Sequence, residues 1–217
     1  MTETADPGGP RIAGAQADAP PFVLASQSPT RRRMLEAAGV PVHAAARPGV
    51  DEDEVKAAFR ADGAGPDDVA EALAEMKAHR VAGRYGGCLV MGADQMLEVD
   101  GAWLDKPETR EQAAQTLRTL SGKTHRLIAC AVVVKDGGRI WHHIESAKLT
   151  VRPLSEDFIQ SYLDAIGPAA FDSVGAYQLE GAGAQLFTRV QGDYFTVLGL
   201  PLLALMDLLR NHGVLPS

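Results

Sequence analysis

The chain reads FVLASQSPTRRR from Phe22 to Arg33, so a short apolar run passes directly into a polar and basic one. The consecutive apolar residues Phe22–Ala25 predict a buried strand. Ser28 is a good N-cap, and Pro29 suits the first helical position because its missing N–H would be unpaired there anyway. We therefore predict a strand followed by a helix over Pro29–Ala38.

The same stretch is a candidate anion site. A helix N-terminus offers free N–H groups and the positive end of the helix dipole, and arginines in the first turn add positive charge. This combination suits a phosphate group. A well-capped surface helix with arginines in solvent explains the local pattern too, so both interpretations stay open at this point.

Short apolar runs alternate with amphipathic segments along the rest of the chain, as is typical of an α/β domain. Further strands are predicted at Val42–Ala45, Leu89–Gly92, Gln95–Val99, Ala102–Leu104, Arg126–Val134, Ile140–Ser146 and Thr150. Further helices are predicted at Asp51–Ala61, Pro66–Ala82, Thr109–Leu120, Ser155–Ile166 and Pro201–Arg210. The turns Asp100-Gly101 and Asp136-Gly137-Gly138 predict hairpins. We therefore expect a mixed, strongly twisted sheet flanked by helices rather than a purely parallel sheet.

Length and composition indicate one globular domain. The chain has 217 residues, of which 46% are hydrophobic and 23% charged, and no run is long enough to cross a bilayer. Residues 1–20 lack the blocks of a secretory signal, which predicts a disordered tail, a folded domain over residues 21–217 and a cytosolic location. Cys88 and Cys130 lie in separate apolar runs and are predicted to be buried thiols.

The charge balance disfavours one class of partner. A net charge of −7 disfavours a general nucleic-acid binder, whose binding surface would be basic. Any basic site must therefore be local. For an acidic protein that binds a phosphate chain, a divalent cation is the natural link between carboxylates and substrate oxygens.

Acidic residues stand at two places where such chemistry could occur. The run Asp51–Glu54 precedes a predicted helix, and acids favour a helix N-terminus, with metal ligation as the alternative. Asp94 follows the apolar run Leu89–Ala93, so we expect it at the C-terminal end of a buried strand, where ligands bind in open α/β sheets. A turn before Gln95 is the alternative for Asp94.

Polar and glycine-rich segments supply weaker candidates. Lys77 falls on a predicted helix and Lys106-Pro107 in a loop, and each lysine could simply be solvated. Ser121–His125 reads as a turn that enters a strand, with a phosphate contact as the alternative. Two glycine-dense segments, 175–184 and 191–201, flank a short strand and allow tight turns or close approach to a ligand.

Taken in order, these segments resemble the Maf family of nucleoside triphosphate pyrophosphatases from Phe22 to Gly213. The matching motifs are Ala25–Arg33, Asp51-Glu52, Lys77, Ala93-Asp94, Lys106-Pro107, Ser121–His125, Gly192–Tyr194 and Gly199–Pro201. The resemblance implies an elongated α/β domain of two lobes, similar to inosine triphosphatases, with the active site in a central cleft. Family members are often homodimers, although nothing in this sequence identifies an interface.

The resemblance also implies a reaction, the hydrolysis of a nucleoside triphosphate between its α- and β-phosphates, with Mg²⁺ or Mn²⁺. Glu52 and Asp94 would hold the metal, and Asp94 matches the family's proposed proton acceptor for water. Positive charge on the substrate side would come from lysines and arginines. The implied phosphate-binding residues are Ser26, Ser28, Arg31, Arg32 and Lys77, and Lys106 joins Asp94 and Glu52 as catalytic.

Three positions associated with base preference in the family match Thr30, Gln95 and Glu180. Gln95 and Glu180 resemble the 7-methyl-GTP branch, Thr30 fits neither branch, and Tyr177 looks more like the branch that acts on dTTP and UTP. A carboxylate at Glu180 can accept two hydrogen bonds from guanine N1–H and N2–H₂, whereas uracil offers one donor. The sequence therefore favours 7-methyl-GTP or another modified nucleotide, with dTTP or UTP as the alternative.

The family implies removal of modified nucleotides and has been linked to arrest of cell division. A hypothesis of another class is therefore a nucleotide-sensing regulator that needs no turnover. A pure sensor would have no reason to keep both Glu52 and Asp94 beside the cationic residues, so the enzyme is the favoured interpretation.

Overall fold

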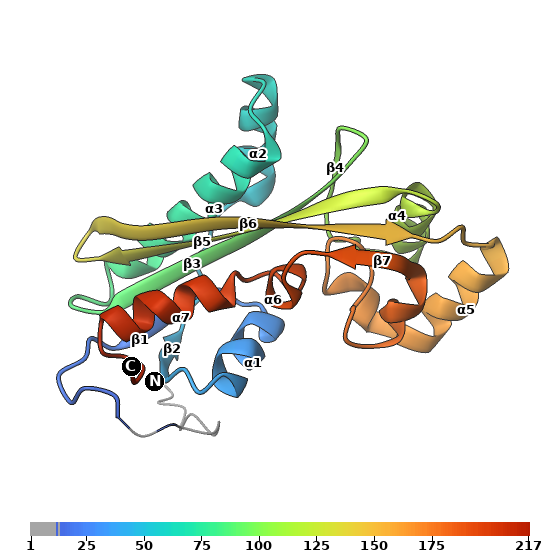
Figure 1. Cartoon of the computed structure of the whole chain (residues 1–217). Coiled ribbons are helices and arrows are strands. Elements are labelled where there is room, and N and C mark those ends of the chain that lie inside the picture. Colours follow the sequence, from blue (N-terminus) through green and yellow to red (C-terminus); the bar gives the residue numbers. More distant parts are fainter. Residues whose placement is uncertain (1–11, 13) are drawn as a thin grey trace.

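The computed structural model describes residue 12 and residues 14–217, and in them one mixed sheet runs through the molecule (Figure 1). The strands are β1 (Phe22–Ala25), β2 (Val42–Ala45), β3 (Leu89–Val99), β4 (Ala102–Leu104), β5 (Thr124–Lys135), β6 (Gly138–Val151) and β7 (Phe187–Gln191). Their order is β2-β1-β3-β5-β6-β7, with β4 on the far part of β3. β1 is parallel to both neighbours and the other pairs are antiparallel, which confirms the predicted mixed sheet.

The predicted helices are all present. They are α1 (Pro29–Ala37), α2 (Glu52–Ala61), α3 (Pro66–Ala82), α4 (Arg110–Leu120), α5 (Glu156–Ile166) and α7 (Leu202–Asn211). Ser28 Oγ accepts a hydrogen bond from Arg31 N–H at 3.3 Å, as its predicted N-cap role requires. The short helices η1 (Gly167–Phe171), η2 (Ala182–Leu186) and α6 (Tyr194–Val197) were not predicted, because such short segments show no helical periodicity.

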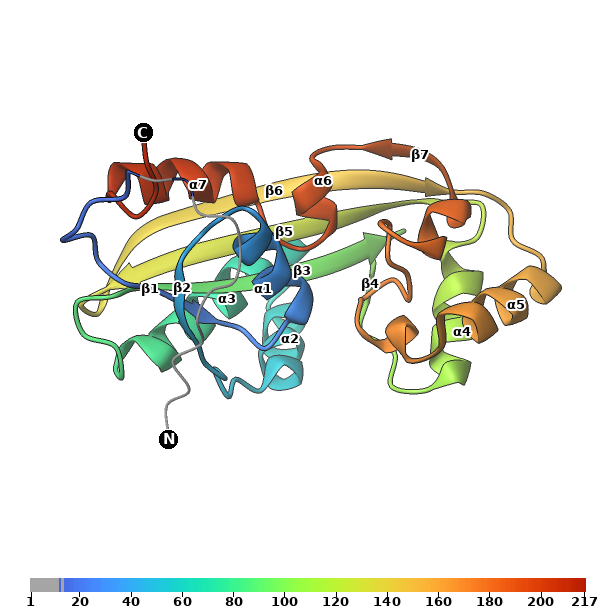
Figure 2. The same ribbon diagram turned by 90° about the horizontal axis from the view of Figure 1, so that it is seen from below.

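The molecule is elongated because β3, β5 and β6 are long and are shared by two lobes (Figures 1 and 2). In one lobe α4 and α5 pack on the far ends of these strands around Leu117, Leu127 and Leu149. In the other lobe α1 and α7 cover one face of the sheet, with Leu35 and Leu205 fully buried, and α3 covers the opposite face. The two lobes with a shared sheet agree with the expected architecture.

Three further observations concern α7, the cysteines and the lengths of the helices. Leu202, Leu205 and Leu209 of α7 are buried, and both cysteines are buried and free. Among the described residues, no helix combines the length and the apolar character needed to cross a membrane.

The predicted tail, residues 1–20, lies partly outside the described residues, which exclude 1–11 and 13. The disordered tail stays a prediction, and the described residues 14–20 make two contacts with the folded domain. Gln16 N–H donates to Gly213 O at 2.9 Å, and Ala19 packs on the core beneath α7. The loop that follows α7 thus supplies the partner that the composition of the segment alone does not reveal.

Two strand assignments were wrong, because segments predicted as separate strands are continuous. Ile140–Ser146 and Thr150 both belong to β6. Leu89–Gly92 and Gln95–Val99 form the single strand β3, so Asp94 lies within a strand, opposite Cys130 of β5, and not at a strand end or a turn. A carboxylate is tolerated there because Lys77 pairs with it. The neighbouring strand β1 ends at Ala25, opposite Gly92, so Asp94 still lies just beyond the carboxyl end of a parallel strand.

Candidate active site

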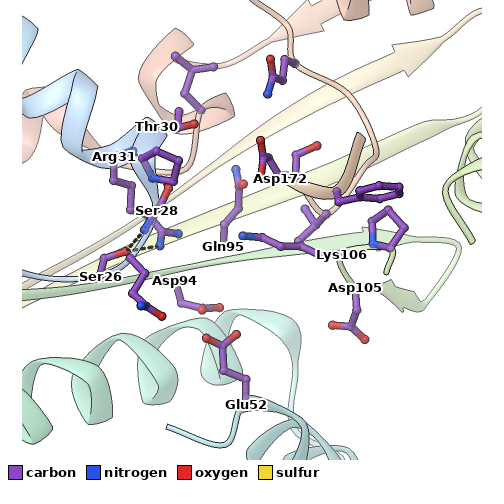
Figure 3. Close-up of a pocket in the computed structure, with 18 of the residues that line it drawn as sticks. Ser26, Ser28, Thr30, Arg31, Glu52, Asp94, Gln95, Asp105, Lys106 and Asp172 are labelled. Atoms are coloured by element: carbon purple, nitrogen blue, oxygen red, sulfur yellow. Dashed lines mark hydrogen bonds between the residues drawn. The ribbon is translucent and has the colours of Figure 1, made fainter. Parts of the chain in front are cut away.

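A cleft of about 600 Å³ lies between the two lobes (Figure 3). It is lined by the start of α1, by α2 and α3, by the middle of β3, by the loop after β4 and by the segment 171–180. The cleft brings together nearly all of the site residues predicted from sequence: Ser26, Ser28, Thr30, Arg31, Glu52, Lys77, Asp94, Gln95, Lys106 and Glu180.

Lys77 links the two candidate metal ligands. Its Nζ donates to Asp94 Oδ1 at 2.6 Å and lies 2.6 Å from Glu52 Oε1. Lys77 and Asp94 are both buried, whereas Glu52, at the start of α2, is partly open to the cleft. Lys77 therefore holds the two carboxylates together, and its contact with a substrate phosphate stays a prediction.

Gly92 permits this arrangement. A Cβ at Gly92 would lie 2.1 Å from Ala74 O and 2.6 Å from Ala78 N, so α3 packs directly on the backbone of β3. Only glycine allows such a close approach. The short distance between helix and strand lets Lys77 reach Asp94 two residues further along β3.

Glu52 and Asp94 form the acidic pair for which the sequence predicts a divalent cation. Asp94 Oδ2 is buried and has no hydrogen-bond partner in the described part of the chain. Burial by itself would raise the pKa of Glu52, but the Lys77 ammonium outweighs it and lowers that pKa, which keeps the carboxylate charged. The described residues contain no cluster of three or more metal-ligating side chains. Two carboxylates nevertheless suit Mg²⁺, which keeps several waters and binds substrate phosphates.

The start of α1 forms a second, cationic wall. Arg31 Nε donates to Gly199 O at 2.9 Å, and Arg31 Nη1 donates to Ser26 Oγ at 3.3 Å. Ser26 Oγ also accepts a hydrogen bond from Ser28 N–H at 3.2 Å. Burial lowers the pKa of Arg31, opposed by Asp94 and Glu52, but a guanidinium stays charged at neutral pH. The guanidinium is thus fixed beside the free N–H groups of the helix, where an anion would bind.

Two lysines extend the positive charge. Partial burial and then the charge of Arg31 lower the pKa of Lys106, because both disfavour its charged form. An anionic group bound beside Lys106 would stabilise that charged form. Lys56 pairs with Asp105 at 2.5 Å on the cleft wall, and both were missed at the sequence level. The signal for Lys56 was its spacing, since it follows Glu52 by four residues and so shares a helix face with it.

The far end of the cleft holds the candidate base-reading residues. Gln95 Nε2 donates to Thr196 O at 3.1 Å and to Val197 O at 3.0 Å, so its amide group braces α6 and only its oxygen stays available. Glu180 is exposed and makes no hydrogen bond or ion pair with any described residue. Thr30 lies across the cleft on α1 (Figure 3).

Two predicted features do not join the cleft. Arg32 is exposed and pairs with Glu36 at 2.7 Å on the outer face of α1, because consecutive helix residues point about 100° apart. The segment Ser121–His125 lines no part of the cleft. Ser121 Oγ accepts a hydrogen bond from Leu154 N–H, and His125 is buried, so the structural interpretation of this segment fits better than a phosphate contact.

Comparison with known proteins places this cleft in a family context. The family model described as Maf-like protein matches residues 21–212. A nucleoside triphosphate pyrophosphatase of Paramagnetospirillum magneticum is 56% identical over 89% of this chain and 99% of its own length. A protein of Rhodospirillum rubrum with the same name is 48% identical over 91% of this chain and 98% of its own. A 7-methyl-GTP pyrophosphatase of Rhizobium etli is 47% identical over 90% and 98%, respectively.

Proposed function

The chain belongs to the family of Maf-like proteins, and on that premise we propose that it hydrolyses nucleoside triphosphates to nucleoside monophosphates and pyrophosphate. The observation that carries the proposal is the buried Asp94, paired with Glu52 through Lys77, at the floor of a cleft whose other wall is cationic. Carboxylates and cations facing one another are what a triphosphate and its counter-cation need.

Asp94 is the proposed general base. Water attacks the α-phosphorus, the bond from that phosphorus to the bridging oxygen of the β-phosphate breaks, and pyrophosphate leaves. The proton of the attacking water passes to Asp94, whose Oδ2 has no other partner among the described residues. The hydrogen bond from Lys77 to Asp94 Oδ1 holds the carboxylate in place for this transfer.

Glu52 and Asp94 would hold Mg²⁺ or Mn²⁺, which when bound neutralises phosphate charge and polarises the phosphoryl oxygens. Arg31, the N–H groups at the start of α1 and Lys106 would bind the phosphate chain and stabilise the negative charge on the departing pyrophosphate. The bond from Arg31 Nε to Gly199 O fixes the guanidinium before the substrate arrives, so little reorganisation is needed.

For the base, we propose a preference for 7-methyl-GTP. Glu180 is an acceptor with no partner among the described residues, and guanine presents two adjacent donors that suit a carboxylate. Methylation at N7 also leaves a positive charge on the ring, which a carboxylate favours further. The name of the Rhizobium etli relative supports this choice. A cytosolic location and a homodimer stay predictions from the sequence.

Product analysis tests the reaction itself. The protein would be incubated with 7-methyl-GTP and Mg²⁺, and the quenched mixture separated by anion-exchange chromatography, with a chelator-treated sample as control. We expect equal amounts of 7-methyl-GMP and pyrophosphate, and none after chelation. Formation of 7-methyl-GDP and orthophosphate would overturn the assigned bond cleavage. Nucleotide binding with no product from any nucleotide would favour the sensor hypothesis instead.

A further inference from the structure

His125 and Tyr177 form a buried polar pair that takes no part in the proposed chemistry. The pair lies behind the end of the cleft that holds the candidate nucleobase-reading residues Gln95 and Glu180, which we call the base end. His125 Nε2 lies 2.6 Å from the hydroxyl oxygen of Tyr177, and only 2% of the histidine and 5% of the tyrosine surface are exposed. His125 comes from the start of β5, whereas Tyr177 belongs to the irregular segment that lines the cleft. The Phe187 ring packs edge-on against Tyr177, with ring centroids 4.8 Å apart.

The His125–Tyr177 pair lowers the stability of the fold relative to an apolar pair of the same shape. His125 Nδ1 is buried without a hydrogen-bond partner among the described residues, and leaving a polar atom in that state costs free energy. Burial lowers the pKa of His125 to about 4, so the ring is neutral at neutral pH. An apolar pair of the same shape would avoid the unsatisfied nitrogen. A buried polar group without a hydrogen-bond partner needs a physical explanation. A role of His125 in positioning Tyr177 is such an explanation.

The backbone next to Tyr177 is strained and is held by hydrogen bonds from side chains. Ala176 has φ +57°, a left-handed conformation that costs energy for any residue with a Cβ. Ser173 Oγ accepts a hydrogen bond from Tyr177 N–H at 2.9 Å and donates to Tyr177 O at 2.6 Å. The Tyr162 hydroxyl donates to Ala176 O at 3.4 Å. These bonds hold the turn, whereas the Tyr177 ring packs on Phe187 of β7 and, among the described residues, its hydroxyl is hydrogen-bonded to His125 alone.

The position of Tyr177 determines where the next residues of the chain lie in the cleft. Gln178 follows Tyr177 directly, Glu180 lies two residues further, and both line the cleft. The segment after them is tightly folded, because a Cβ at Gly183 would lie 2.4 Å from Gln178 O. A shift of Tyr177 would therefore move Gln178 and Glu180 with it, because the tightly packed backbone of the turn cannot change conformation to compensate.

We propose that His125 is a positioning residue for base selection, which anchors Tyr177 to β5 and thereby sets where Gln178 and Glu180 meet the nucleobase. The proposal rests on the proposed function and deepens it. The catalytic carboxylate Asp94 lies on β3 and is held by Lys77, so the anchor affects which base is accepted rather than the chemical step.

Tyr177→Phe tests the proposal with the least disturbance, because it keeps the ring and removes only the hydroxyl. The measurement is kcat and KM over a panel of nucleoside triphosphates, with the best wild-type substrate as the reference. We expect the ratio of kcat/KM between that substrate and the others to fall about tenfold, mainly through KM, the scale of one hydrogen bond. The kcat of the best substrate should change less than about threefold.

Three further proteins make the result decisive. His125→Gln replaces the imidazole with an amide that can still bond to the Tyr177 hydroxyl and should retain most of the selectivity, whereas His125→Phe should behave like Tyr177→Phe. The matched control is Tyr85→Phe, which also removes a tyrosine hydroxyl but lies outside the cleft and makes no side-chain hydrogen bond with a described residue, so it should leave the ratio within about twofold.

Two outcomes would overturn the proposal. One is an unchanged ratio in both Tyr177→Phe and His125→Phe, confirmed as folded by thermal melting. The other is an equal fall of kcat for every substrate, which would make the pair merely structural. Failure of the proposed function is distinct from both, because the wild-type protein would then turn over no nucleotide at all.

Discussion

The two ends of the cleft are built in different ways. At the acidic end, Lys77 and Asp94 stand within a long helix and a long strand whose backbones satisfy their own hydrogen bonds. At the base end, the segment 172–181 between the short helices η1 and η2 is irregular and contains the strained Ala176, so side chains must hold it. Rigid elements suit chemistry that needs fixed geometry, whereas a side-chain-tethered segment can change base preference without disturbing the reaction.

Removing the charge of Asp94 should have the largest effect of all. Asp94→Asn keeps the shape of the side chain but cannot accept the proton of water, so we expect kcat to fall by about 10³-fold or more. Asp105→Asn is the matched control, because it makes the same change on the cleft wall, where the carboxylate pairs with Lys56. We expect this control to stay within about threefold of the wild type. Comparable losses in both variants would remove Asp94 from its assigned role.

Gly92→Ala should disrupt the packing of α3 on β3 at the acidic end of the cleft. The added Cβ meets backbone atoms of α3, which cannot rotate away, so we expect a loss of about 3 kcal/mol in the free energy of unfolding. Gly86→Ala, where a Cβ meets nothing within 4 Å, should cost less than about 1 kcal/mol. Denaturant titration followed by circular dichroism measures both. Equal stabilities would mean that helix and strand are not tightly packed at this point.

The base end should respond to acid through His125. Its pKa is about 4 in the folded protein against 6.5 for an exposed histidine, so the unfolded chain takes up the proton first as the pH falls below about 6.5. Its contribution to stability is therefore lost between about pH 6.5 and 4. Between pH 7 and 5 we expect this group alone to cost about 2 kcal/mol. The wild type should lose about that much more stability than His125→Phe over this interval, and identical pH dependence would contradict the assignment.

Glu180→Gln should give the smallest change in rate and the clearest change in preference. The amide replaces one acceptor by a donor, which suits uracil better than guanine, so the kcat/KM ratio of 7-methyl-GTP to UTP should fall about tenfold. The melting temperature should stay unchanged, because Glu180 has no hydrogen bond or ion pair among the described residues. An unaltered substrate profile would show that this carboxylate does not contact the base.

The sequence predicted the acidic end better than the base end, for a physical reason. Periodic apolar patterns and caps located α1 and α3, and the ordered motifs placed Glu52, Lys77 and Asp94 together. The pattern did not show that β3 continues through Asp94, because a charged residue in a strand makes sense only once its partner on α3 is known. It likewise put Arg32 beside Arg31, although the helical rotation turns Arg32 to the outer face.

The base end was less predictable because its structure depends on contacts between distant residues. His125 and Tyr177 are 52 positions apart, and neither local propensity nor periodicity links them. Gly199 appeared in a motif, but its role as the acceptor for Arg31 depends on the path of the chain after α6. Irregular segments of this kind lack the repeating pattern on which sequence-based prediction relies.

The most direct test of the account is the release of pyrophosphate from 7-methyl-GTP, GTP, UTP, dTTP, CTP and ATP, measured with Mg²⁺ and with a chelator. The account predicts metal-dependent release, with the highest kcat/KM for 7-methyl-GTP. The absence of release from every nucleotide, in folded protein that still binds one of them, would contradict it.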